Sequence, residues 1–164
     1  MRTRRRRMKS CAVAVIDMNG IAGTVRFESA SGHRVRVRYN IRGLPCGLHG
    51  FHIHQYGDLT EGCESACSHF NPKRSAHGGP RSRVRHAGDL GNIRSAHGVS
   101  RGSIIVNGIS LNSASEKSVI GRSIVIHKDA DDLGRGGNPE SLKTGNAGER
   151  LACAVIGISN PRLA

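Results

Sequence analysis

Six of the nine histidines fall within one stretch, Leu48–Asn92, and this density constrains the fold more than any other feature of the chain. A satisfied core seldom holds imidazoles this close together in sequence, whereas neutral imidazole is a common protein ligand for zinc and copper. The fold is therefore expected to gather these side chains around metal ions. They are His49, His52, His54, His69, His77 and His86.

The spacing of the first histidines predicts the element that carries them. His52 and His54 stand two residues apart in GFHIH, so on a β-strand they share one face. Phe51 and Ile53 then point to the core. The later candidates lie in a run rich in Gly, Pro, Asn and Ser, which favours a loop. Three imidazoles and one carboxylate suit tetrahedral zinc, and this run supplies His69, His77, His86 and Asp89.

Short segments separated by turn residues indicate a β-rich fold. The segment HRVRVRY at 33–39 alternates arginine with valine, as in a half-buried antiparallel strand, and Asn19-Gly20 is a hairpin turn signal. Strands are predicted at Cys11–Asp17, Thr24–Phe27, His33–Tyr39, Gly50–Gln55, Gly102–Leu111, Ser123–His127 and Leu151–Ile158. Together with long loops at 56–92 and 129–149, this pattern predicts an all-β sandwich or barrel.

Length and charge place bounds on organisation and location. The chain has 164 residues and a formal charge of +13, which predicts one domain, residues 11–164, with an attraction to anions. Residues 1–10 form a polybasic arm with no apolar face, so disorder is expected there. No apolar run approaches the roughly 18 residues that span a membrane, and CAVAVI is too short for a signal peptide. A cytoplasmic protein is expected, and the arm can equally be read as a nuclear address.

Several motifs in order resemble one known family. GFHIHQYGD, HFNP, HGGP and RHAGDLGN resemble the metal-site signature of the copper/zinc superoxide dismutases. IGRSIVIHKDADDLGRGGN and GNAGERLACAVIGI resemble the second signature of that family. The similarity runs from about Cys11 to Ile158. It implies an eight-stranded Greek-key β-barrel, an immunoglobulin-like sandwich with two long functional loops.

The resemblance also implies two metal sites that share His69. Each ring nitrogen of His69 would face one metal, and Asp131 would hydrogen-bond one copper ligand and one zinc ligand to fix their orientation. His127, which read alone is a surface histidine, gains its role from the HKDADD context. The implied copper ligands are His52, His54, His69 and His127, and the implied zinc ligands are His69, His77, His86 and Asp89. His49 is expected to bond backbone, and His33 and His97 to be exposed.

The implied activity is superoxide dismutation, in which two superoxide ions give dioxygen and hydrogen peroxide. A histidine-bound copper is reduced and reoxidised in turn, zinc is structural, and His69 takes part by accepting a proton. Arg150 matches the guiding arginine of the family, and Lys143 and Glu140 match its channel rim. Pro139 departs from the pattern, because an acidic residue is common there, and its presence makes the channel more positive.

The five cysteines cannot all pair within one chain. The resemblance implies a disulfide between Cys63 and Cys153, which ties the metal loop to the last strand. Cys67 departs from the family pattern and could compete for Cys153 or for metal. Cys11 and Cys46 are expected to be buried thiols that behave as small hydrophobes.

The resemblance further implies partners. The substrate is superoxide, a copper chaperone is a candidate partner, and no membrane contact is expected. A homodimer is expected, because the family's contact positions are apolar or small here and carry no charge. These positions are Tyr56, Gly57, Ile120, Gly121 and Ile158.

Other functional classes compete with an active enzyme. Inactive metal-binding relatives usually lose a copper ligand or the guiding arginine, and this chain keeps them all. A nucleic-acid-binding protein with only the dismutase fold is less favoured, because five aromatic residues offer few stacking platforms. The arm stays open between a solvated tail and a non-specific anchor to nucleic acid or another polyanion. The arginines that would assist an anchor are Arg34, Arg36, Arg38, Arg81, Arg83 and Arg85.

Overall fold

The first of two sheets consists of strands whose side chains alternate between core and solvent. In the computed structural model, which describes residues 10–160, β3 (Arg34–Arg42) buries Val35, Val37 and Ile41 and exposes the arginines between them. The sheet is antiparallel, with strand order β10-β1-β2-β3-β7. Its other strands are β1 (Cys11–Met18), β2 (Ile21–Ala30), β7 (Val99–Val106) and β10 (Gly157–Ile158).

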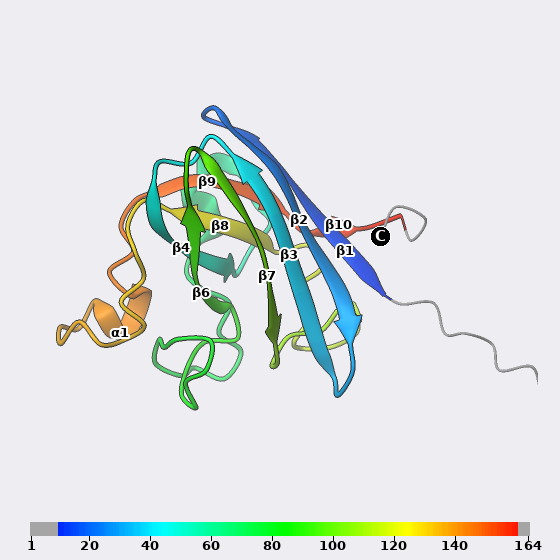
Figure 1. Cartoon of the computed structure of the whole chain (residues 1–164). Coiled ribbons are helices and arrows are strands. Elements are labelled where there is room, and N and C mark those ends of the chain that lie inside the picture. Colours follow the sequence, from blue (N-terminus) through cyan, green and yellow to red (C-terminus); the bar gives the residue numbers. More distant parts are fainter. Residues whose placement is uncertain (1–9, 161–164) are drawn as a thin grey trace, which may run out of the picture.

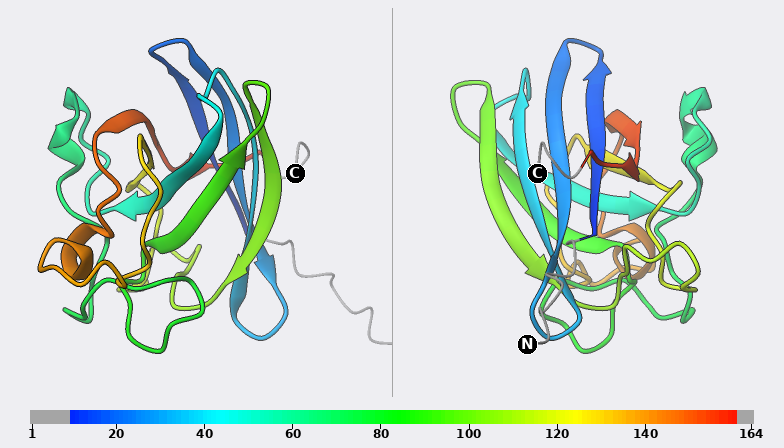
Figure 2. Two further views of the ribbon diagram at one scale, coloured as in Figure 1. Left: turned by 60° about the vertical axis from the view of Figure 1, so that its left-hand side comes forward. Right: turned by 90° about the vertical axis from the view of Figure 1, so that its right-hand side faces the viewer.

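The second sheet is buried on both faces. One face packs on the first sheet through apolar side chains such as Phe51 and Ile53, and loops cover the other face. Its antiparallel order is β6-β4-β8-β9. These strands are β4 (Gly47–His54), β6 (Asp89–Ser95), β8 (Ser123–His127) and β9 (Arg150–Val155). Figures 1 and 2 show the long loops gathered on the side of this sheet that faces away from the first.

The all-β prediction is confirmed, with two antiparallel sheets as the barrel requires. Eight longer strands make up the two sheets in residues 10–160, and the two-residue β10 extends the first sheet at its edge. The loop predicted at 56–92 also contains β5 (Thr60–Cys63) and a 3₁₀ turn, Glu64–Ala66. The loop predicted at 129–149 contains one short helix, α1 (Ser141–Thr144).

Strand β6 was not predicted, and the loop assigned to 56–92 wrongly included its first residues. The segment DLGNIRS holds Asp, Asn and Gly, which are depleted in strands, and Gly91 has φ +82°. Pairing with β4 makes the strand, since Leu48 lies opposite Arg94 and His52 opposite Asp89. The tertiary contact therefore overrides the local propensity.

Two of the sequence predictions concern residues that the structure does not describe. Apart from Ser10, the polybasic arm falls outside residues 10–160, and so do the last four residues of the predicted domain. Among the helices in the described range, none has the length and apolar character needed to cross a bilayer.

Candidate metal centre

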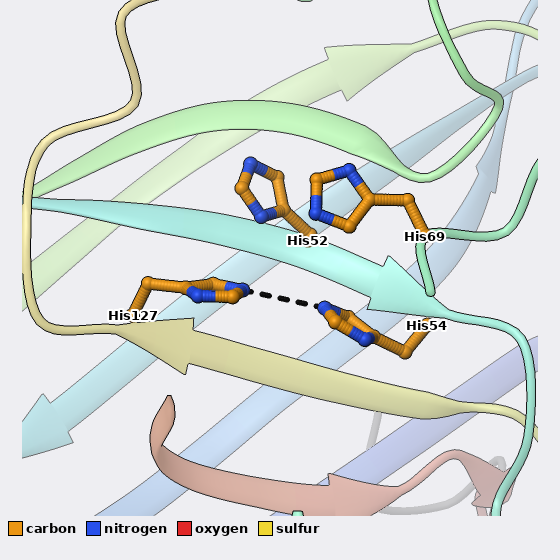
Figure 3. Close-up of side chains that lie close together, drawn as sticks. All are labelled: His52, His54, His69 and His127. Carbon is orange, nitrogen blue, oxygen red and sulfur yellow. Dashed lines mark hydrogen bonds between the residues drawn. The ribbon is translucent and has the colours of Figure 1, made fainter. Parts of the chain in front are cut away.

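Two adjacent strands carry three of the four implied copper ligands. His52 and His54 alternate with Phe51 and Ile53 on β4, so both imidazoles leave the core side of the sheet. His127 ends β8, which pairs with β4, and a register shift beside Ile126 re-aims the strand end. The Nε2 atoms of His54 and His127 lie 3.3 Å apart (Figure 3).

His69 completes this group from the loop that follows the 3₁₀ turn. It forms an isolated β-bridge with His54, which fixes its backbone against the end of β4. Its ring lies 4.0 Å, centroid to centroid, from the ring of His52, and Figure 3 shows the four imidazoles turned toward a common centre. Each offers a ligand nitrogen within 4.8 Å of the others, and all four side chains are buried.

The second group converges on one carboxylate oxygen. The Oδ1 atom of Asp89 lies 2.9 Å from Nδ1 of His69, 3.0 Å from Nδ1 of His77 and 3.2 Å from Nδ1 of His86. The Oδ2 atom accepts hydrogen bonds from the backbone N–H groups of His86 and Gly78, at 2.7 and 3.1 Å. Asp89 is therefore fixed in orientation and presents one oxygen to three imidazoles.

Asp131 connects the two groups. Its carboxylate oxygens lie 2.8 Å from Nε2 of His52 and 2.8 Å from Nε2 of His77. Asn92 holds Asp131 in place, because its amide donates to the Asp131 carbonyl at 2.8 Å and accepts from the Asp131 N–H at 2.7 Å. One carboxylate thus fixes the tautomer of a ligand in each group, since both rings must donate from Nε2 and leave Nδ1 as the ligand atom.

Burial and charge set the protonation of the site. Burial lowers the pKa of His52 to about 3 and that of His127 to about 4, and it also lowers the pKa values of His54 and His69. Burial acts in the same direction on His77, but hydrogen bonds to Asp131 and Asp89 outweigh it and raise the pKa of His77 to about 9.

The two carboxylates show the reverse balance. Burial alone would raise the pKa of Asp89, but hydrogen bonds from His69, His77 and His86 hold it far below its usual range. The pKa of Asp131 is likewise lowered by its bonds to His52 and His77, against the effect of burial. Metal binding requires neutral imidazoles and ionised carboxylates. The lowered pKa values of the four-imidazole group already favour neutral rings, whereas His77, whose raised pKa favours the protonated ring, must release a proton when it binds a metal.

Unpartnered ring nitrogens show that the residues fit metal ions. Two buried imidazole nitrogens, Nδ1 of His52 and Nε2 of His69, have no hydrogen-bond partner in the described part of the chain. Nδ1 of His77 is also buried, and Asp89 Oδ1 lies 3.0 Å from it. A buried polar atom without a partner costs free energy, so each of the two unpartnered atoms calls for a ligand. Four imidazoles suit copper, and three imidazoles with a carboxylate suit zinc.

The remaining histidines behave as the sequence predicts. His49 is buried, and its ring nitrogens lie 2.9 Å from the carbonyl oxygens of His127 and Pro45, so it bonds backbone. His33 and His97 are exposed.

Two supporting residues were missed from the sequence. Asn92 ends the RHAGDLGN motif, which was the available signal. Gly145, at φ +70°, follows α1 and lies so close to His77 and Asp131 that a Cβ there would collide with both side chains. A glycine just after a short helix is the sequence signal for such a position.

A cavity of about 650 Å³ opens over the four-imidazole group. His54, His69 and His127 line it, and so does Arg150 at the start of β9. Glu140 and Lys143, which flank or belong to α1, line it as well. The structure therefore brings the residues predicted for the channel and its rim to one opening.

The predicted disulfide between Cys63 and Cys153 is present and joins β5 to β9. It also fixes Arg150, whose guanidinium donates to the carbonyls of Cys63 and Cys67 at 2.6 and 2.7 Å. The expectation of buried thiols is wrong for Cys46, which is exposed, and Cys11 is only half-buried, because β1 turns it to the outer face of the sheet. Cys67 is exposed and lies outside the disulfide.

A two-sheet antiparallel barrel that supports adjoining copper-type and zinc-type ligand groups, joined through one imidazole, defines a binuclear β-barrel metalloprotein. Comparison with known proteins gives the particular family. The family model for copper/zinc superoxide dismutase matches residues 21–156.

Curated relatives agree over most of the chain. A copper/zinc superoxide dismutase of Paramecium bursaria Chlorella virus 1 is 53% identical over 148 residues, covering 89% of this chain and 77% of the relative. Superoxide dismutase A of Xenopus laevis is 52% identical, covering 89% and 96%. An extracellular copper/zinc superoxide dismutase of Onchocerca volvulus is 50% identical, covering 90% and 76%.

A solved structure is similar as well. It is described as that of the clock protein EA4, and it matches with a TM-score of 0.88 at 43% identity, covering 96% of this chain and 100% of that chain. The chain belongs to the copper/zinc superoxide dismutase family. Its activity is the dismutation of superoxide to dioxygen and hydrogen peroxide, with copper and zinc as cofactors.

Proposed function

We propose that the two ligand groups divide the metals between them. His52, His54, His69 and His127 hold copper, and His69, His77, His86 and Asp89 hold zinc. The observation that carries this assignment is that His52 and His69, which belong to these groups, each keep one buried ring nitrogen without a hydrogen-bond partner among residues 10–160. Bound copper supplies one-electron chemistry by alternating between Cu(II) and Cu(I), while zinc has no redox chemistry.

The side chains of this chain bring the substrate in and manage its protons. Superoxide is a small anion, and the Arg150 guanidinium lies near His127 in the lining of the cavity, which Lys143 also lines. Nε2 of His69 is the buried atom at which a proton can be held at the reacting centre. Asp89, 2.9 Å from Nδ1 of His69, orients that ring for the role.

The assignment is tested by comparing two histidine variants. His52→Ala removes a buried imidazole from the four-histidine group, so copper content and superoxide consumption are expected to fall to near background. His97→Asn removes an exposed imidazole, and Asn tolerates the backbone there at φ +50°. Elemental analysis and a superoxide consumption assay on both proteins decide the matter, and full activity in His52→Ala would refute the copper assignment.

The competing hypothesis of an inactive metal-binding relative finds no support in the geometry. Such a protein would lack a copper ligand or Arg150. Here the four imidazoles of the copper group lie together, and Arg150 lines the cavity over them. Measurable activity with both metals bound excludes it.

We further propose a homodimer in a cytoplasmic setting, with a copper chaperone as a transient partner. Support for the dimer comes from exposed apolar side chains, since Ile158 is 80% and Tyr56 50% exposed. Gly57 and Gly121 lie in close contact, so the two predicted contact segments form one surface. The compartment rests on the sequence alone, because the relatives include an extracellular form.

The arm is proposed as a sequence-independent anchor for nucleic acid or another polyanion. Six of its ten residues are Arg or Lys, and binding through phosphates should fall steeply with salt as counterions are released. Deleting residues 2–7 is expected to weaken binding to duplex DNA while dismutation stays nearly unchanged. Equal binding by the truncated and full chains at matched salt would rule the anchor out.

A further inference from the structure

A second cavity, separate from the one over the copper group, lies beside the zinc loop. It encloses about 540 Å³, within the range of small-molecule sites. Its basic lining residues come from three segments: the start of β3, the loop before β6, and the region after β7. Figures 1 and 2 show these segments meeting at one end of the barrel. The basic residues are Arg34, Lys73, Arg81, Arg83, Arg85 and Lys117.

No carboxylate from residues 10–160 lines this cavity. Within residues 10–160, the side chains of Lys73, Arg81, Arg83 and Lys117 take part in no hydrogen bond or ion pair. Like charges that converge on a hollow repel one another and destabilise the fold unless an anion neutralises them. Elsewhere the chain does pair its charges, as Lys128 does with Glu149 at 3.2 Å.

The base of the cavity is fixed. Arg85 donates to the backbone carbonyls of His86 and Asn107 at 2.8 and 2.7 Å, and to the Asn107 side chain at 2.9 Å. These bonds join the zinc loop to the segment after β7. Ile105 and Val106 also line the cavity. The site is therefore largely preformed, which lowers the entropy cost of binding.

We propose that this cavity binds a compact oligophosphate, a small molecule that carries several phosphate groups close together. Arginine forks match phosphate oxygens in a bidentate manner, and the cations surround a hollow instead of following a groove. Among the described residues that line the cavity there is no Phe, Tyr or Trp, so they offer no platform on which nucleic-acid bases could stack.

The test uses the full chain loaded with copper and zinc, and inorganic tripolyphosphate as the probe in a calorimetric titration. One site per chain is expected. The double variant Arg81→Ser/Arg83→Ser should weaken binding by about tenfold or more, because it removes two charge-assisted contacts. Both side chains are exposed, and thermal unfolding checks that the variant remains folded.

A charge-matched control separates a site from general attraction. Arg42→Ser/Arg94→Ser also removes two exposed arginines. Arg42 lies at the end of β3 opposite Arg34, about 26 Å away, whereas charges are screened over about 10 Å at 0.1 M ionic strength. Arg94 lies at the end of β6 away from Asp89. Tripolyphosphate binding by this control should stay within about twofold of the unchanged chain.

A short duplex DNA distinguishes the other source of phosphate. If the pocket variant loses tripolyphosphate but keeps duplex binding, the cavity takes the compact ligand. The proposal is overturned by absent tripolyphosphate binding or by equal losses in the two double variants. It is also overturned if the pocket variant loses only duplex DNA, because the cations would then contact a nucleic-acid backbone.

Discussion

At the scale of single residues, the Arg150 guanidinium both carries a charge and forms structural hydrogen bonds. Its guanidinium holds the carbonyls of Cys63 and Cys67 and also borders the cavity over His127. Arg150→Glu is expected to slow superoxide consumption by about tenfold or more, because a reversed charge repels the substrate. Arg150→Lys keeps the charge and should retain much more of the rate. Raising ionic strength should slow the unchanged enzyme, since screening weakens steering.

Copper content shows whether an Arg150 variant is slow because it attracts superoxide less well or because it holds less copper. Neither substitution removes a ligand, so elemental analysis should find both metals in all three proteins. An Arg150→Glu protein with an unchanged rate at low salt would contradict the steering role. A protein that loses copper in proportion to activity would instead show that Arg150 maintains the site.

Single residues also mark how far the sequence could predict the site. The spacing of His52 and His54 on a strand, and the His/Asp run that follows, were sufficient to predict side chains that the fold gathers into groups able to hold a metal ion. His127 was not predictable from spacing, because read alone it is a surface histidine beside Lys128. The supporting role of Asn92 depends on two bonds to Asp131 across 39 residues, which no local pattern encodes.

At the scale of elements, the disulfide connects β5 to β9 across a sequence separation of 90 residues. Cys63→Ser/Cys153→Ser is expected to lower the free energy of unfolding by up to about 4–5 kcal/mol in the chain-entropy model, and by less where zinc already orders the loop. The rate should fall too, because Cys63 then no longer fixes the carbonyl that Arg150 holds.

Urea denaturation of the metal-loaded protein measures the loss, and Cys46→Ser provides the control. Cys46 is exposed and lies outside the disulfide, so its replacement should shift the unfolding midpoint very little. Peptide mapping of the unchanged chain shows whether Cys67 competes for Cys153. An unchanged unfolding midpoint in the double variant would contradict the stabilising role of the disulfide.

Elements with clear alternation were the predictable ones. The segment predicted at His33–Tyr39 is strand Arg34–Arg42, because its valines and arginines separate cleanly onto two faces. Strand β6 was not predictable, since Asp89 and Asn92 are poor strand formers; Asp89 belongs to the candidate zinc group, and Asn92 bonds Asp131. In β6, residues that the site requires stand in place of residues with high strand propensity.

At the scale of the whole molecule, much of the positive charge is concentrated in three separate regions. The surplus of +13 lies partly in the arm, partly on the outer face of β3, and partly around the cavity beside the zinc loop. At the cavity over the four-imidazole group, Arg150 and Lys143 are the only Arg or Lys residues of the described chain in the lining, which also includes Glu140. Net charge therefore attracts anions of many kinds, whereas the narrow set of residues at each cavity decides which anion is bound.

The exposed apolar side chains of the molecule predict that the chain assembles into a dimer. Ile158 on the edge strand β10 is 80% exposed, and Val155 and Tyr56 nearby in the fold are 41% and 50% exposed. Burying such side chains against a second copy removes apolar area from water, at roughly 25 cal/mol per Å². The chain is thus expected to sediment at twice its 17.5 kDa mass at micromolar concentration.

Ile158→Glu places a charge within the contact and should shift the protein to a monomer. Val99→Glu, on β7 at the opposite edge of the same sheet, should leave the dimer intact. A monomeric mass for the unchanged chain would exclude this interface, and equal dissociation of both variants would place the contact elsewhere.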